Sequence, residues 1–222
     1  MTYDCIMPLG AGSKVGNLEA RIAVASLRKF FRGLGRIIIV GEDPGIEGVE
    51  VVRCDEPGAV TKDGNIIGKV YRGIVAHPDV SAQFLFVSDD ILITKESSWE
   101  DFTPRYVDES GIRASDRTWE RRIVKTVDRF GEGARFFEPH IFSPMLTMGF
   151  LEMCRRYDYM HDEAVTFQSL YYNFIGERGV PVFDHALIKV PATLPDCRHI
   201  AYTDRAIADT GFQRQLLKIV EP

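Results

Sequence analysis

The chain has 222 residues, of which 45% are apolar and 27% are charged, and its formal net charge is −5. This length and composition are typical of one globular domain with a full hydrophobic core, so we expect a single domain over residues 1–222. A general nucleic-acid binder is not expected, because such proteins usually carry a basic surface. The four cysteines form no CxxC pair, which disfavours a zinc or redox motif.

No apolar run approaches the ~18 residues of a membrane-spanning helix, and no basic-then-apolar segment opens the chain. We therefore expect a cytoplasmic protein without a membrane span. The sequence does not indicate an oligomeric state.

Short apolar runs alternate with helical patterns over the first 94 residues. Residues 3–9 read as a strand that leads into a Gly-rich loop. From Asn17 onward, apolar residues recur at three- and four-residue spacing, which predicts a helix that ends near Gly33. This alternation is typical of an α/β fold with a mostly parallel central sheet flanked by helices. The further predicted elements are strands at 36–40, 49–53 and 84–87 and a helix at 65–76.

The pattern is less regular after residue 94. Residues 95–115 show no clear periodicity, and a loop of that length is usually a functional lid or disordered. Residues 116–130 predict an amphipathic helix, and residues 135–142 a strand or extended segment. The remaining predictions are helices at 145–156 and 163–175, short strands at 180–183 and 186–190, and a closing helix within 204–220.

Two adjacent carboxylates, Asp89 and Asp90, interrupt the apolar sequence FLFVSDDILIT at residues 84–94. Such a pair is costly to bury unpaired. Ligands of open α/β sheets bind at the carboxyl ends of strands, where carboxylates suit a hard divalent cation. We expect Asp90 to bind Mn²⁺ or Mg²⁺ directly and Asp89 to contact a ribose or an outer water. The alternative is an acidic pair that caps a solvent-exposed turn.

The loop GAGSKVG at residues 10–16 is a candidate for binding an anion. Gly10 and Gly12 allow close backbone approach, the loop amides can face an anion, and Lys14 adds positive charge. The loop has neither the P-loop spacing nor the GxGxxG spacing, and an ordinary tight turn is the alternative. Its position after the first strand favours a contact to a nucleotide or phosphate.

Other polar residues have both a functional and a structural interpretation. His140, bracketed by two prolines, could bind manganese or act as a base, although a lone histidine is more often part of the core. Asn17 fits a helix N-cap, and Glu19 complements the helix dipole. A polar group on a later helix could line a pocket, but a solvated face is commoner; its members are Gln168, Ser169 and Asn173.

Several segments together resemble the GT-A type glycosyltransferases related to the Stealth capsular-polysaccharide transferases. MPLGAGSKVGNLEARIAVASLRKFF followed by RIIIVGEDP is similar to the opening of those chains, with an Asn-x-Glu-x-Arg helix matched by Asn17, Glu19 and Arg21. FLFVSDDILIT is similar to their strand and Asp-Asp segment, EPHIFSPM to a His-x-x-x-Pro segment, and SLYYN to a recurring helix. The opening Tyr-Thr-Trp-Val-Asp-Gly-like element of Stealth proteins is absent.

The resemblance implies a Rossmann-like GT-A fold, with a nucleotide-binding half at residues 1–94 and an acceptor or lid half at 95–222. It implies metal-dependent transfer of a sugar from a nucleoside-diphosphate sugar to a hydroxyl acceptor. The alternatives are a Stealth-like sugar-phosphate transferase and a non-catalytic binding protein on the same fold. The metal and diphosphate would lie beside Asp89 and Asp90, with His140 as a second metal ligand or diphosphate contact. Gly10, Gly12, Lys14, Asn17 and Arg21 would contact the nucleotide, and the general base would be Asp116, Glu138 or Asp184.

Overall fold

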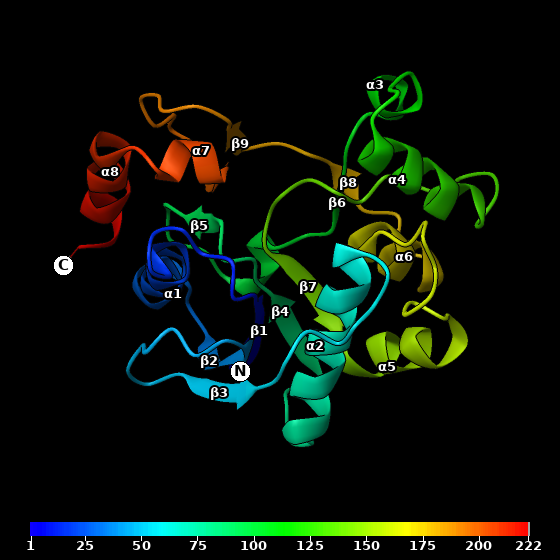
Figure 1. The fold of residues 1–222 in the computed structure, drawn as a ribbon, viewed down its shortest axis with the longest axis horizontal. Coiled ribbons are helices and arrows are strands. Elements are labelled where there is room, and N and C mark those ends of the chain that lie inside the picture. The colour runs from blue at the N-terminus through cyan, green and yellow to red at the C-terminus, as the bar shows by residue number, and fades with distance from the viewer. Residues whose placement is uncertain (222) are drawn as a thin grey trace.

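A computed structural model describes residues 1–221 and has a mixed α/β fold around one five-stranded sheet (Figure 1). The strand order is β3-β2-β1-β4-β7, in which the first four are parallel and β7 runs antiparallel to β4. The sheet is therefore mostly parallel, as predicted. Its strands are β1 (Tyr3–Leu9), β2 (Leu34–Gly41), β3 (Glu50–Arg53), β4 (Gln83–Phe86) and β7 (Ser143–Leu146).

Helices cover both faces of this sheet (Figure 1). Helix α1 (Leu18–Phe30) connects β1 to β2 on one face, and α2 (Lys62–Ala76) connects β3 to β4 on the other. Successive residues of a strand point to opposite faces. Accordingly Met7 packs in the core beneath α1, whereas Ile6 packs in the core beneath α2. This alternation explains why the inner strands are apolar throughout.

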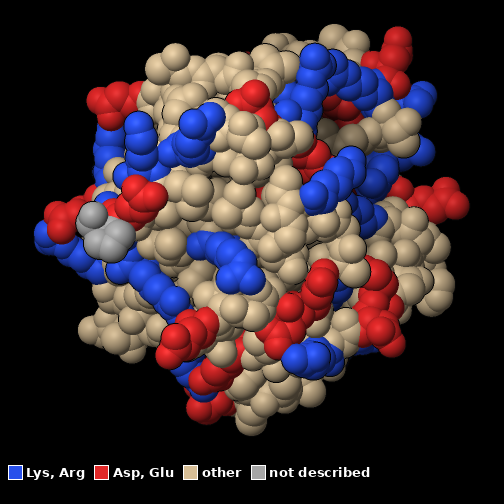
Figure 2. All heavy atoms as spheres, turned by 60° about the vertical axis from the view of Figure 1, so that its left-hand side comes forward, with Lys and Arg blue, Asp and Glu red and all other residues tan. Residues whose placement is uncertain are grey.

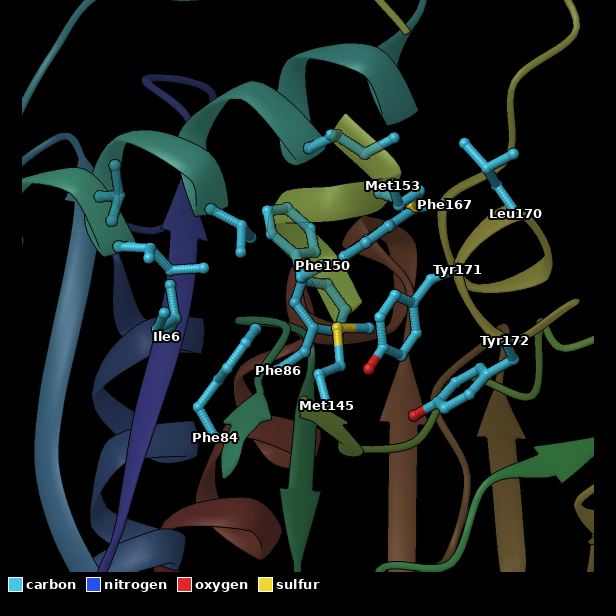
Figure 3. Close-up of a cluster of buried hydrophobic side chains, with 14 of the residues drawn as sticks. Ile6, Phe84, Phe86, Met145, Phe150, Met153, Phe167, Leu170, Tyr171 and Tyr172 are labelled. Carbon is cyan, nitrogen blue, oxygen red and sulfur yellow. The ribbon is translucent and has the colours of Figure 1, made fainter. Parts of the chain in front are cut away.

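Aromatic side chains fill the core on the α2 face (Figure 3). Phe84 and Phe86 of β4 meet Phe150 of α5 (Thr147–Arg156) and Phe167 of α6 (Phe167–Phe174). The rings of Phe86 and Phe167 are edge-to-face, with centroids 4.9 Å apart, an arrangement that stabilises aromatic pairs. This packing fixes β4, the strand that leads into the acidic pair.

A smaller sheet lies beside α1 and is built from distant parts of the chain. Its strand order is β5-β10-β9, with β5 (Ile91–Ile93) antiparallel to β10 (His199–Tyr202) and β10 parallel to β9 (His185–Ile188). Two helices follow, α7 (Asp204–Ile207) and α8 (Thr210–Val220), and α8 packs against α1. The carboxyl-terminal part of the chain thus packs on the same side of the central sheet as α1 and pairs with β5.

Residues 95–142 contain several short elements. Strand β6 (Arg105–Tyr106) pairs with β8 (Val180–Pro181), and two helices lie between β6 and β7. Residues 135–142, predicted as a strand or an extended segment, form no strand; the segment is non-helical and makes one isolated bridge, from Phe136 to Val107. The shorter elements of this region are a 3-10 turn (Trp99–Asp101), α3 (Glu109–Arg113) and α4 (Thr118–Asp128).

The surface carries charges of both signs. On the face drawn in Figure 2, Lys and Arg side chains are mixed with Asp and Glu, and uncharged areas lie between them. Among residues 1–221, no helix has both the length and the apolar character needed to cross a bilayer.

Candidate functional site

A cavity of about 620 Å³ lies at the carboxyl-terminal edge of the sheet. Its walls come from the segments that follow β1 and β4 and from the first turns of α2. Ligands of open α/β sheets bind at this edge. Asp89 and Asp90 lie in the turn after β4, and both line the cavity.

The acidic pair is held in place from two sides. The hydroxyl of Ser88 donates to Asp90 Oδ1 at 2.6 Å, and the backbone N–H of Tyr202 donates to the carbonyl of Asp90 at 3.0 Å. Burial and the neighbouring charge of Asp90 raise the pKa of Asp89 to about 6. The buried carboxylate of Glu19 acts in the same direction, whereas Lys62 opposes it. The pair therefore carries an excess of negative charge that a bound cation would relieve.

Positive groups face the same cavity from α2. Lys62, in the first turn of α2, and the buried Lys69 both contribute to its lining. The helix begins after Thr61, whose hydroxyl accepts from the Gly64 N–H at 3.0 Å. A helix N-terminus carries partial positive charge and favours anions. The cavity thus combines a carboxylate wall with a cationic wall.

The Gly-rich loop contributes only part of its predicted contacts. Gly10, Gly12 and Ser13 line the cavity. Lys14 lies outside that lining; its side chain is 78% exposed and its Nζ is 3.7 Å from Asp204 Oδ2. An ion pair that exposed contributes little, so Lys14 would have to move to reach a ligand in the cavity.

Asn17 is the N-cap residue of α1, as predicted, but its side chain does not make the cap. Asn17 adopts a left-handed conformation with φ of 59°, and within the described chain its side chain makes no capping hydrogen bond. The Ser13 hydroxyl braces the turn before the helix, because it accepts from the Asn17 N–H at 2.8 Å and donates to Glu19 Oε2 at 2.8 Å. The loop therefore fixes the Glu19 carboxylate at the cavity wall.

Arg21 points to a different part of the molecule from Asp90. Its guanidinium donates to the Pro44 carbonyl at 2.5 Å and lines an open hollow between α1 and residues 45–47. The structure thus separates Arg21 from the Gly10, Gly12 and Asp90 cluster with which the sequence grouped it.

His140 lies within electrostatic reach of Asp90 but outside the cavity lining. Desolvation lowers the pKa of His140, and the negative charge of Asp90 only partly offsets this. The imidazole lies next to the Trp119 ring, with centroids 5.9 Å apart, and its backbone has a left-handed φ of 48°. A neutral imidazole is the form that binds metals.

The two predicted base candidates Glu138 and Asp184 also lie outside the cavity lining. Desolvation and the nearby Asp63 raise the pKa of Glu138 to about 8. Its carboxyl accepts from the Ser169 N–H at 3.0 Å, in the first turn of α6. Asp63 accepts from the Phe167 N–H at 3.3 Å, so the two carboxyls jointly cap this helix.

Asp184 holds the start of β9. Its Oδ1 accepts from the Arg198 N–H at 2.9 Å, and its backbone has a left-handed φ of 50°. The Nζ of Lys95 is 3.9 Å from the same oxygen. The third base candidate, Asp116, is exposed on the segment before α4.

The donor set suits a divalent cation completed by ligand oxygens. Two carboxylates line the cavity side by side, and the pKa of Asp89 is raised first by burial and then by the charge of Asp90. Within residues 1–221, no three His, Cys, Asp or Glu side chains are arranged as a metal-binding group. Magnesium and manganese sites commonly use one or two carboxylates plus phosphate oxygens and water. Asp90 and Asp89 fit that arrangement.

Sequence reasoning missed several residues of the cavity. Lys69 lies on the apolar face of α2, next to the fully buried Ile67 and Val70. A charged residue on an apolar helix face is the signal in the sequence that could have identified it. Lys62 was missed because the helix was predicted to begin at residue 65. The true start is hard to recognise, because Thr61 is a possible N-cap but Gly64, three residues later, is typical of a loop. Glu56 lies between the strand predicted at 49–53 and the helix predicted at 65–76, where the sequence indicated no site.

Neither the known protein-family models nor the curated proteins contain a match to this chain.

Proposed function

We propose that this protein is a metal-dependent glycosyltransferase that moves a sugar from a nucleoside-diphosphate sugar to a hydroxyl acceptor. The observation that carries the proposal is the placement of Asp89 and Asp90 in a cavity at the carboxyl-terminal edge of the sheet. Lys62, Lys69 and the N-terminus of α2 line the same cavity. This pairing of carboxylates with cationic groups suits a diphosphate that carries a divalent cation.

The fold is compatible with this proposal. A β3-β2-β1-β4 parallel order with an antiparallel fifth strand and helices on both faces supports a Rossmann-like assignment. We take the sheet to be of the GT-A type, which the sequence resemblance implies. The donor would then enter over the ends of β1 and β4.

The residues divide into groups with different tasks. Asp90, with Asp89 beside it, would hold Mn²⁺ or Mg²⁺, which supplies Lewis-acid stabilisation of the diphosphate as the leaving group. Lys62 and the α2 N-terminus lie where they can bind phosphate oxygens. Gly10 and Gly12 let the loop backbone approach the donor closely. Ser88 and Tyr202 position Asp90 through the two hydrogen bonds described above.

The test measures turnover of a panel of nucleoside-diphosphate sugars in the presence of Mn²⁺. Turnover is monitored through the release of the nucleoside diphosphate. The informative variant is Asp90→Asn, which keeps the shape of the side chain and removes its charge. We expect a loss of about 100-fold or more, since Lewis-acid assistance is worth several kcal/mol. The matched control is Asp196→Asn, because Asp196 is 94% exposed and pairs with Lys95 outside the cavity. Equal turnover in Asp90→Asn and wild type would refute the proposed metal role.

The mass of the acceptor product distinguishes the two transfer reactions. A product that gains one sugar residue supports the proposal. A product that gains a sugar together with a phosphate would replace it with sugar-phosphate transfer. Failure of every donor to bind in the presence of Mn²⁺ would favour a non-catalytic protein on this fold.

A further inference from the structure

Lys69 and Glu56 form the shared wall between two hollows. One is the 620 Å³ cavity that contains Asp89 and Asp90, and the other is a neighbouring hollow of about 660 Å³ beyond the ends of β2 and β3. Both residues line both hollows. Any molecule that extends from one hollow into the other passes this pair.

The two partners differ sharply in burial. Lys69 projects from α2 with its side chain 5% exposed, whereas the side chain of Glu56 is 54% exposed on the loop before α2. Lys69 Nζ donates to Glu56 Oε1 at 2.5 Å and to the Leu9 carbonyl at 2.9 Å. A buried ammonium group requires an anionic partner, but a carboxylate at the rim can return to water at little cost. Glu56 is therefore the replaceable member of the pair.

Two glycines, one just after β1 and one at the end of β2, lie beside the ammonium group. A Cβ at Gly10 would lie 3.6 Å from Glu56 Oε1 and 3.9 Å from Lys69 Nζ. A Cβ at Gly41 would lie 3.3 Å from Lys69 Nζ and 2.0 Å from the Leu9 carbonyl oxygen. Gly10 therefore leaves room for a ligand atom beside the ammonium group, next to the Glu56 carboxylate. At Gly41 the Leu9 carbonyl fills the place of a side chain, and this close approach brings the carbonyl within reach of Lys69 Nζ.

We propose that Lys69 binds the diphosphate of the donor and that Glu56 is an internal carboxylate that occupies Lys69 until the donor arrives. Donor binding then breaks the Glu56–Lys69 ion pair and releases the loop that carries Glu56. A diphosphate offers more negative charge than one carboxylate, so the exchange favours the ligand once it reaches the cavity. This inference rests on the proposed function of the cavity. Because the Glu56 carboxylate competes for Lys69, it lowers the affinity of the cavity for weakly charged anions.

The experiment is calorimetric titration with inorganic pyrophosphate in EDTA, which leaves the metal contribution out. Glu56→Gln keeps the side-chain size and removes the competing charge, so we expect pyrophosphate to bind roughly 10-fold more tightly than to wild type. Lys69→Gln should weaken binding roughly 10-fold or more. Lys14→Gln is the matched control, because Lys14 is an exposed lysine outside the lining and its loss should leave the affinity unchanged.

Glu56→Gln decides the outcome even if Lys69→Gln does not fold, because Glu56 is more than half exposed. Equal pyrophosphate affinity in wild type and Glu56→Gln would overturn the exchange. Failure of this inference is distinguishable from failure of the proposed function. If only this inference fails, the protein turns over the donor with Mn²⁺, but its affinity for pyrophosphate does not depend on Glu56. If the proposed function fails, no donor is turned over, while Glu56→Gln still changes the affinity for pyrophosphate.

Discussion

Replacing Asp89 with asparagine should make the metal-free protein more stable at neutral and alkaline pH. Asp89 lies next to Asp90 in the cavity wall, and burial with the adjacent charge raises its pKa to about 6 from an ordinary value of 3.8. The folded state therefore binds the Asp89 proton more tightly than the unfolded state does. Stability contributed by the protonated form is lost as the pH rises from about 4 to about 6, and it stays lost at higher pH.

The size of the effect follows from that difference in pKa. One pKa unit corresponds to 1.36 kcal/mol, so the ionised Asp89 carboxylate costs about 3 kcal/mol at most when the pH is well above 6. The asparagine side chain removes this charge while keeping the shape. We expect a gain of about 1 to 3 kcal/mol, which for a domain of this size raises Tm by roughly 2 to 12 °C.

The assay is thermal or urea unfolding of wild type and Asp89→Asn in EDTA at about pH 8 and at about pH 4. The difference in stability between Asp89→Asn and wild type should be large at about pH 8 and small at about pH 4. Glu132→Gln, which alters an exposed carboxylate, is the control and should show no such pH dependence. A less stable Asp89→Asn protein at about pH 8, or an equal difference at both pH values, would refute the reasoning about charge repulsion.

Two further substitutions test other parts of the structure. Burial and Asp63 raise the pKa of Glu138 to about 8 from an ordinary value of 4.5, so its carboxyl is protonated at neutral pH and wild type should lose stability as the pH rises from about 4.5 to about 8. Glu138→Gln should remove that loss in urea unfolding, and an unchanged pH profile would contradict the assignment. Gly41→Ala should destabilise the protein by more than about 2 kcal/mol, because the φ of Gly41 is 127° and the added Cβ would meet the Leu9 carbonyl. Gly12→Ala should cost little, because the added Cβ meets no atom within 4 Å. Similar unfolding midpoints for the two alanine variants would show that Gly41 is not constrained.

The parallel half of the sheet could be predicted from sequence because its residues form long apolar runs with clear boundaries. Tyr3–Leu9 was predicted with its observed limits, and the strands before and after α1 were displaced by at most two residues. The antiparallel strand β7 was missed, since Ser143–Leu146 is short and contains Pro144, and it was partly absorbed into a predicted helix. Proline is tolerated there because β7 lies at the edge of the sheet.

Long-range pairing explains what else the sequence could not provide. β10 has four residues and lies between β9, which precedes it closely, and β5, which is far away in the chain. The same limitation applies to the cavity. Asp89 and Asp90 could be found because two carboxylates interrupt an apolar run, whereas Lys69 became a candidate only once the fold placed α2 over the end of β1.

The placement of Arg21 shows the reverse case. It belongs with Asn17 and Glu19 to the Asn-x-Glu-x-Arg segment, for which the resemblance implied a shared site. On a helix, however, residues two apart point in different directions. Glu19 turns inward to the cavity, while Arg21 turns outward to Pro44.

The most direct test of the central claim is a calorimetric titration of Mn²⁺ into protein saturated with a nucleoside diphosphate, with wild type compared against Asp90→Asn. Binding of the metal through Asp89 and Asp90 predicts one Mn²⁺ per wild-type chain, with affinity that depends on the nucleotide and falls by roughly 10-fold or more in the variant. The same Mn²⁺ affinity in both proteins, or affinity that is independent of the nucleotide, would contradict a metal–diphosphate site at this edge of the sheet.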